Sequence, residues 1–328
     1  MSEVSGRQIF KAKTKEAFVI KIIGELLANT LTHSQFTINN NGIFLFQANE
    51  PENQLVEISL YKEAFGSNFK CIKDINFLIN STTLYKLLKN IKKKDSISIT
   101  ITENEDDESM TLGICVEPPD NNNKLTTNIR IASYQPTIME PICGYENPVV
   151  MSGKEFQGTK NLQHSSDTMF IQSKGEYIKF SVCDDDRHDR KLEVGNIDDE
   201  DNRDCSLYSK TFKTAHITSL CKCAGQSQSI HIYLNDDLPL KIKMKAGGLG
   251  DISVYIKSLE MIADEADEDF LNLNTKKETE QEYYETQSNN NWDELQENSK
   301  LNNVTELEDE KSSMPAKPKR GRQKKILA

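Results

Sequence analysis

The residues that come closest to a catalytic or metal site form an acidic run near the middle of the chain. Positions 184–189 hold four aspartates and His188, and carboxylates beside an imidazole could bind a hard cation or serve a metal-dependent nuclease. Arginines and a lysine interrupt and follow this run, and further acids stand at 198–201. That alternation is typical of a solvated hairpin loop, so we expect no metal ion and no catalytic residue there.

The other nucleophiles and imidazoles are spaced too irregularly for an active site. His33, His216 and His231 have no carboxylate or cysteine partner at a catalytic spacing, and the sequence has no glycine-rich phosphate loop. The seven cysteines are an odd number, and the pair Cys221 and Cys223 lacks the spacing of a zinc knuckle. The chain is therefore predicted to be no enzyme and to need no metal or cofactor.

A sequence repeat organises the elements that must position the remaining polar residues. Residues 36–101 recur 133 positions later in the chain. The offset aligns turn glycines, apolar helix residues, a helical lysine and a strand triplet: Gly42 with Gly175, Leu84 with Ile217, Leu87 with Leu220, Lys89 with Lys222, and Ile97, Ile99 and Ile101 with Ile230, Ile232 and Leu234. Such different residues rarely share one register by chance, so we interpret the repeat as a duplication.

Hydrophobic periodicity predicts an α+β fold with similar elements in each copy. In the first copy we expect helices at 15–30 and 82–91 and strands at 8–13, 36–46 (a hairpin), 55–61, 72–79, 96–101, 110–116 and around 129–131. In the second copy we expect helices at 154–163 and 213–223 and strands at 169–172, 177–182, 229–234, 240–245 and 247–256.

Composition shifts divide the chain into a predicted series of segments. These are a flexible N-terminus at 1–8, one domain at 9–133, a proline-containing connector at 134–148, a second domain at 149–262 and a disordered tail at 263–328. No apolar run approaches a membrane span, and 1–7 is polar, so we expect a soluble intracellular protein without a membrane partner.

The charge of the chain is uneven. Residues 264–310 carry 16 acids and 3 bases, whereas 311–328 carry 7 bases and no acid, so the tail accounts for −6 of the net charge of −11. The folded part is thus also acidic overall, and any contact with DNA must be local. Near the C-terminus, Lys319, Arg320, Gly321 and Arg322 resemble an AT-hook for the DNA minor groove, and a nuclear-import signal is an equal alternative.

The order of elements and several short motifs resemble the proliferating cell nuclear antigen family of DNA sliding clamps. The similarity covers about 9–262 and rests on Phe10-Lys11-Ala12, Asp237-Leu238-Pro239-Leu240, and Gly250 with Ile252 and Tyr255. It implies two tandem clamp-type domains with helices lining one face and antiparallel sheets outside, and three chains closing into a ring around duplex DNA. The implied partners are DNA polymerase, other clamp-binding proteins and a clamp-loader ATPase, in the nucleus or another intracellular site of replication.

The resemblance also implies which residues face DNA. They are the helix lysines Lys21, Lys86, Lys89, Lys160 and Lys222, together with His164. Lysines at loose spacing attract phosphates without reading bases, although any polar helix carries lysines on its wet face. Ile22, Ala28 and Ala215 stand where the family is often basic, which predicts a less positive hole.

A pocket for short partner peptides is implied on the outer surface, beneath the connector. The matching residues are Ala48, Ile138, Ile142, Pro239 and Tyr255, and ordinary core packing is the alternative for Pro239 and Tyr255. Lys257-Ser258 replaces the family's Ala-Pro pair, which leaves the peptide specificity open. Lys174 lies near a position that is modified in the family.

Three functions follow as hypotheses. The first is a homotrimeric clamp that acts as a polymerase processivity factor. The second is a clamp-like subunit of a heterotrimer for damage signalling or transcription, motivated by the altered pocket and the less positive hole. The third, from a different class, is a metal-dependent nuclease built on the acidic run.

Overall fold

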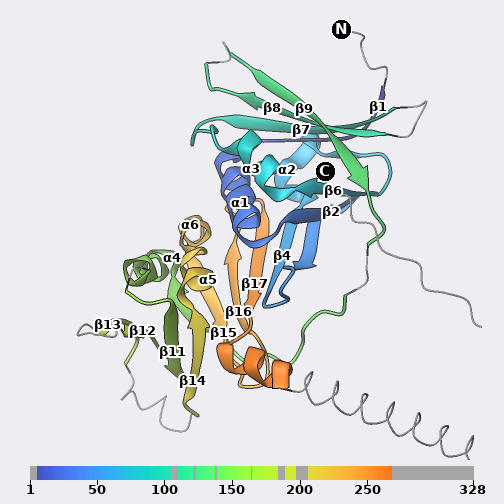
Figure 1. Ribbon diagram of the computed structural model, residues 1–328. Coiled ribbons are helices and arrows are strands. Elements are labelled where there is room, and N and C mark those ends of the chain that lie inside the picture. Colours follow the sequence, from blue (N-terminus) through green and yellow to red (C-terminus); the bar gives the residue numbers. More distant parts are fainter. Residues whose placement is uncertain are drawn as a thin grey trace, which may run out of the picture. The chain divides into compact units, whose positions relative to one another are not determined.

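The computed structural model describes residues 6–104, 109–120, 123–136, 139–163, 165–183, 189–196 and 206–267. The described residues up to Ala266 form one compact unit. Within that unit the chain is mostly antiparallel sheet with a few short helices, as expected for the clamp fold (Figure 1).

The first half of the chain contains two substantial helices and most of a large sheet. Its elements are β1 (Gly6–Thr14), α1 (Ala17–Thr30), β2 (His33–Asn39), β3 (Gly42–Ala48), β4 (Gln54–Tyr61), α2 (Lys62–Phe65), η1 (Gly66–Asn68), β5 (Lys70–Cys71), β6 (Ile75–Asn80), α3 (Ser81–Leu88), β7 (Ser96–Asn104), β8 (Met110–Glu117) and β9 (Leu125–Ser133). Every predicted strand and helix of this half is present.

The second half has shorter helices. Its elements are β10 (Val149–Ser152), α4 (Gly153–Phe156), η2 (Gln157–Leu162), β11 (Thr168–Lys174), β12 (Tyr177–Cys183), β13 (Asp189–Val194), β14 (Tyr208–Lys213), α5 (Thr214–Thr218), α6 (Cys221–Ala224), β15 (Ser229–Tyr233), β16 (Leu240–Lys245) and β17 (Gly250–Ile256). A further helix covers 259–267, the last residues that the structure describes.

One sheet joins strands from both halves of the chain. Its order is β10-β15-β16-β17-β4-β3-β2-β6-β9-β8-β7-β1-β5, and a smaller sheet has the order β13-β12-β11-β14. The join is the antiparallel pair of β17 with β4, which runs from Gly250 opposite Leu60 to Ile256 opposite Gln54. The two strands lie side by side in Figure 1. The predicted domains therefore share a sheet, and backbone hydrogen bonds hold them together.

Alternating strand residues and the helices enclose a single core. Along β4, Val56, Ile58 and Leu60 are buried, while the residues between them are partly exposed. α1 is apolar on most of its circumference because it packs against α3 on one side and α6 on another. A Cβ added at Gly24 of α1 would lie 2.7 Å from Leu88 Cδ1, so the Leu88 side chain would have to shift to accommodate a larger residue there.

The turn glycines and helix starts of the sequence repeat recur in the structure. Gly42 and Gly175 both have positive φ, at 156° and 57°. α3 begins at Ser81 and α5 begins at Thr214, which is the offset of the repeat. Asn80 caps α3 by accepting a hydrogen bond from the Thr83 N–H at 2.9 Å.

The structure differs from the sequence prediction in four segments. Residues 6–8 are not flexible, because they pair with β7 as part of β1. The helix predicted at 154–163 is α4 followed by the 3-10 helix η2. The last helix continues to 267, five residues past the predicted end of the second domain at 262.

The helix predicted at 213–223 is instead α5 and α6 with an interruption between them. Thr218 Oγ1 donates to Thr214 O at 3.0 Å and Ser219 Oγ donates to His216 O at 2.8 Å. Such side-chain bonds to the preceding turn compete with regular helix geometry. Its start also differs, because Lys213 belongs to β14, a strand that the sequence did not reveal.

Candidate nucleic-acid interface

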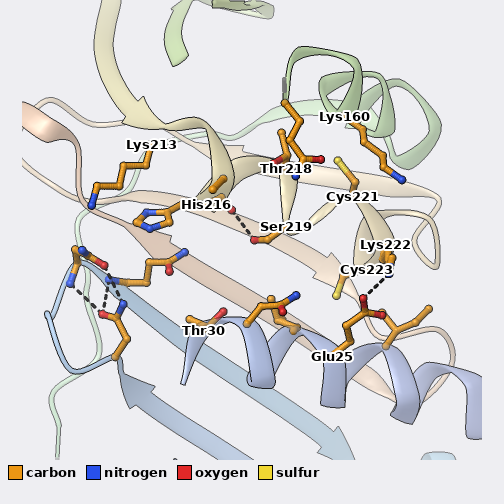
Figure 2. Close-up of a pocket in the computed structure, with 18 of the residues that line it drawn as sticks. Glu25, Thr30, Lys160, Lys213, His216, Thr218, Ser219, Cys221, Lys222 and Cys223 are labelled. Atoms are coloured by element: carbon orange, nitrogen blue, oxygen red, sulfur yellow. Dashed lines mark hydrogen bonds and ion pairs between the residues drawn. The ribbon is translucent and has the colours of Figure 1, made fainter. Parts of the chain in front are cut away.

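A polar pocket of about 700 Å³ lies between α1 and the helices α5 and α6, with η2 at one side (Figure 2). Its charged lining is mainly basic, with Lys160, Lys213 and Lys222 against one carboxylate, Glu25. The rest of the lining is rich in Asn, Gln, Ser and Thr side chains. In a chain with a net charge of −11, this surface is a local exception.

Glu25 and Lys222 form an ion pair across the pocket. Glu25 comes from α1 and Lys222 from α6, so the contact joins distant parts of the sequence. The Glu25 side chain is 19% exposed and the Lys222 side chain 58% exposed. The ammonium of Lys222 therefore already has a counter-ion in the free protein, while water still reaches it.

Lys160 and Lys213 approach the pocket from opposite ends in Figure 2. Lys160 extends from η2 and Lys213 from the last position of β14, and both residues are exposed. Neither forms an ion pair with any residue that the structure describes. Their ammonium groups are therefore available to an external anion.

His216 lies beside Lys213 in the same pocket (Figure 2). Burial lowers the pKa of His216 below its ordinary value of 6.5, and the positive charge of Lys213 lowers it further. The imidazole is consequently mostly neutral at pH 7 and adds little positive charge to the pocket.

The three other lysines that were predicted to face DNA lie near the packed pair α1 and α3. Lys21 Nζ donates to Ile91 O at 3.0 Å and lies 5.5 Å from the Phe18 ring centroid, so its ammonium is engaged inside the protein. Lys86 and Lys89 lie at the C-terminal end of α3 and are exposed. Among the described members of the predicted set, only Lys160 and Lys222 line the pocket.

One of the non-basic departures from the family pattern has a structural reason. Ile22 is only 5% exposed, so a lysine there would place its charge against the core. Ala215 lines the pocket next to His216. Lys213 and His216, which the sequence analysis did not select, supply the polar groups on that side. Its place at the start of the helix predicted at 213–223 was the signal that could have selected Lys213.

The predicted peptide-site residues gather on the other face of the shared sheet. Direct cross-strand partners form a row from Ala48 through Leu55, Tyr255 and Lys241 to Tyr233. Directly opposed residues of antiparallel strands project to the same face. Ala48 and Tyr255 therefore belong to one surface, as predicted residues of one site should.

The connector reaches this row through Tyr145. Tyr145 Oη donates to Pro239 O at 2.7 Å, and its ring lies 6.3 Å from that of Tyr255. Tyr255 Oη donates to Glu57 Oε2 at 2.9 Å. Burial raises the pKa of both phenols well above 10, so both stay protonated and donate their hydrogen bonds. Ile142 is half-buried in the connector.

Several predicted positions lie outside the described residues: His164, Ile138, most of the acidic run at 184–188, and Lys319, Arg320, Gly321 and Arg322. Within the described ranges, no group of three or more His, Cys, Asp or Glu side chains is arranged to hold a metal ion. No helix among the described residues is long and apolar enough to cross a membrane.

Comparison with known proteins gives a consistent picture. Residues 9–135 match the family model for the N-terminal domain of proliferating cell nuclear antigen. The chain is 24% identical over 256 residues to a probable DNA polymerase sliding clamp of Paramecium bursaria Chlorella virus 1, covering 76% of this chain and 96% of that protein. It is 23% identical over 267 residues to the proliferating cell nuclear antigen of Chaetomium thermophilum, covering 76% and 97%. These similarities support the resemblance to the proliferating cell nuclear antigen family that the sequence motifs indicated.

Proposed function

We propose that three copies of this chain close into a ring around duplex DNA and hold a DNA polymerase and other replication or repair proteins on it. The observation that carries the proposal is the helix-side pocket, where three lysines of the second half of the chain collect beside α1 on an otherwise acidic protein. Its two tandem domains would each contribute helices to the inner face. A clamp-loader ATPase would open the ring, in the nucleus or another intracellular site of replication.

The lysines suit a ring that slides. Lys160 and Lys213 are exposed and have long, flexible side chains, so each can exchange one phosphate for the next. Phosphate contacts of this kind are independent of base sequence and weaken with added salt. The role requires attraction without fixed geometry, and the engaged Lys21 would contribute less than the free lysines.

Two strand edges support closure between copies. β13 pairs only with β12 among the described strands, so its other edge is open. β9 pairs with β8 over most of its length but with β6 at Phe77 and Leu78 alone. Leu125 at the start of β9 is 57% exposed. An open edge on each side allows head-to-tail pairing of backbones, and three such pairs close a ring.

Light scattering after size exclusion tests the assembly. The expected mass is three times the chain mass of 37.3 kDa. A monomer at micromolar concentration would contradict a stable homotrimer. The functional test is stimulation of a DNA polymerase on primed circular DNA together with a clamp loader, where the ring should lengthen the product made per binding event.

A heterotrimer subunit is the second candidate, and the Glu25–Lys222 pair favours it. This pair neutralises one lysine of the pocket, and Ala215 supplies no charge beside it. A ring with weaker subunits of this kind would depend on partners for DNA retention. Mixing with related chains decides between the two: a ring that forms only with a paralogue excludes the homotrimer.

The nuclease hypothesis has little support. Its acidic run at 184–188 lies outside the described residues, and relatives with sliding-clamp names match about three quarters of the chain. Incubation of the purified protein with DNA and Mg²⁺ or Mn²⁺ tests it directly. We expect no cleavage.

A further inference from the structure

The outer face of β16 carries a stripe of three lysines. Lys241, Lys243 and Lys245 alternate with the buried Leu240, Ile242 and Met244, so all three lysines project away from the core. Lys245 pairs with Asp251 at 2.8 Å. Lys241 and Lys243 form no ion pair with any carboxylate in the described part of the chain.

Three tyrosines surround the ammonium of Lys241. Lys241 Nζ lies 5.4 Å from the Tyr145 ring centroid, 5.3 Å from that of Tyr233 and 4.9 Å from that of Tyr255. Tyr233 and Tyr255 are its direct cross-strand neighbours, and Tyr145 comes from the connector. Each ring attracts the cation with its negative face, so the ammonium is held in one place.

Lys241 is half-buried by these rings. Burial is the main cause that lowers its pKa below the ordinary value of 10.5, and the nearby Lys243 adds to it, while Glu57 acts in the opposite direction. A cation that is partly stripped of water and lacks an ion-pair partner gains more from an added carboxylate than a fully solvated lysine does.

The row continues from Lys241 into an apolar end. Beyond Tyr255 lie Leu55 and Ala48, both half-buried on the same face. A positive, fixed group thus stands beside aromatic and aliphatic surface. This combination fits a segment that carries an acidic side chain next to an apolar one.

We propose that the partner peptide implied for this face carries a glutamate or aspartate that binds Lys241, next to an apolar side chain that lies towards Leu55 and Ala48. The inference deepens the proposed recruiting function by naming the chemistry of the partner. Lys243, next along the stripe, supports a second acidic residue of the same segment.

The occupant is a peptide and not a nucleic acid because of the carboxylates nearby. Glu57 and Asp251 lie on the same face of neighbouring strands and repel a continuous phosphate backbone. A peptide can place its acids over Lys241 and Lys243 and neutral residues elsewhere. The free lysines of the pocket, by contrast, lie on the helix side.

The test is fluorescence anisotropy with a labelled peptide that alternates Glu with Leu and Tyr, and a matched peptide with Gln in place of Glu. We expect the full-length protein to bind the Glu peptide about tenfold more tightly than the Gln peptide. Lys241→Met should abolish this preference, and Lys241→Arg should keep most of it. Lys11→Met, an exposed lysine of β1, makes the same charge change elsewhere and should have no effect.

Three outcomes would overturn the proposal. Equal affinity for the two peptides would exclude carboxylate recognition, and an equal loss in the Lys11→Met control would reduce the effect to net charge. Displacement of the Glu peptide by duplex DNA would assign the face to nucleic acid. If Lys241→Met fails to fold, the comparison of the two peptides on the wild-type protein and on Lys241→Arg still tests whether a carboxylate is recognised.

DNA retention, measured on the same proteins, separates this inference from the proposed function. Wild-type protein that binds the Glu peptide but never stays on circular DNA would contradict the clamp and leave the peptide site standing. Protein that is retained on DNA but binds both peptides equally would support the clamp and contradict the acidic-peptide site.

Discussion

The helix-side pocket and the outer face of β16 both present lysines, but they prepare those lysines differently. In the pocket, Lys160 and Lys213 are solvated, and Lys222 has Glu25 as an internal partner. On β16, Lys241 is held by three tyrosine rings and has lost part of its water. Solvated lysines attract any polyanion weakly, whereas a fixed, partly buried lysine selects a group of matching geometry. In the proposed clamp, the environment of each lysine, and not the residue type, would separate sliding on DNA from recognition of a partner.

Charge reversal on the helix side should have the largest effect on this contrast. Lys86→Glu combined with Lys222→Glu should weaken retention on DNA by roughly a hundredfold at physiological salt, because two positive charges on the helix side become negative charges that repel phosphates. Assembly should be unchanged, since both side chains are exposed. Retention on nicked circular DNA and light scattering measure the two properties.

The matched control reverses Lys11 and Lys70, which are exposed and directly opposed on β1 and β5. It changes the net charge equally. If this control loses retention to the same extent, the helix side has no special role.

Removal of the connector ring should break the outer face and spare the pocket. Tyr145→Ala deletes a ring beside Lys241 and the hydrogen bond to Pro239 O, and should lower the free energy of unfolding by about 2 kcal/mol. Tyr145→Phe keeps the ring and should cost about 1 kcal/mol. Urea unfolding followed by circular dichroism measures both. Equal losses for the two variants would show that the ring itself contributes nothing.

Removing the negative charge of Glu25 should strengthen the binding of DNA at the pocket. Glu25→Gln frees Lys222 for an external phosphate, so DNA affinity should rise about threefold. The affinity should also fall more steeply with added salt, because up to about one more counter-ion is released from the DNA on binding. A titration of duplex DNA at several salt concentrations gives both values. A drop in affinity would mean that Glu25 orients Lys222 productively instead of competing for it.

The smallest expected effect is a pH dependence from His216. Its pKa is lower in the folded protein than the ordinary 6.5, so the unfolded chain takes up a proton first as the pH falls. Above about pH 7 the imidazole is neutral in both states, so it does not reduce the free energy of unfolding. Below about pH 6.5 its lowered pKa reduces the free energy of unfolding by less than about 1 kcal/mol. In His216→Asn, the melting temperature should fall less between about pH 7 and about pH 5.5 than it does in the wild-type protein. An unchanged slope would assign it to other groups.

Local patterns predicted the elements of the first half almost completely. Gly42 marks its hairpin, where a Cβ would lie 2.1 Å from Leu60 O, and Asn80 marks the start of α3. Predictions failed where contacts distant in sequence override local preference. The helix at 213–223 breaks at Thr218 and Ser219, and β14 exists because β11 offers it a hydrogen-bonding edge.

The candidate site was predicted only in outline. Sequence analysis selected Lys160 and Lys222 but passed over Lys213 and His216, which line the same pocket. It placed Ala48, Pro239 and Tyr255 in one site without indicating Lys241, whose role depends on rings from β15, β17 and the connector. No spacing along the chain encodes the convergence of Tyr145, Tyr233 and Tyr255.

The amino-acid sequence by itself determined the repeat, the alternation of buried and exposed strand residues and the acidic balance of the chain, because these depend on the order of residue types alone. Only the tertiary structure decided which lysines are free. The pairing of β17 with β4 and the packing of α1 against α6 bring Glu25 to Lys222, and the connector brings Tyr145 to Lys241. The sequence determines which residues carry a charge, but the fold determines how much water and which partners surround each charge.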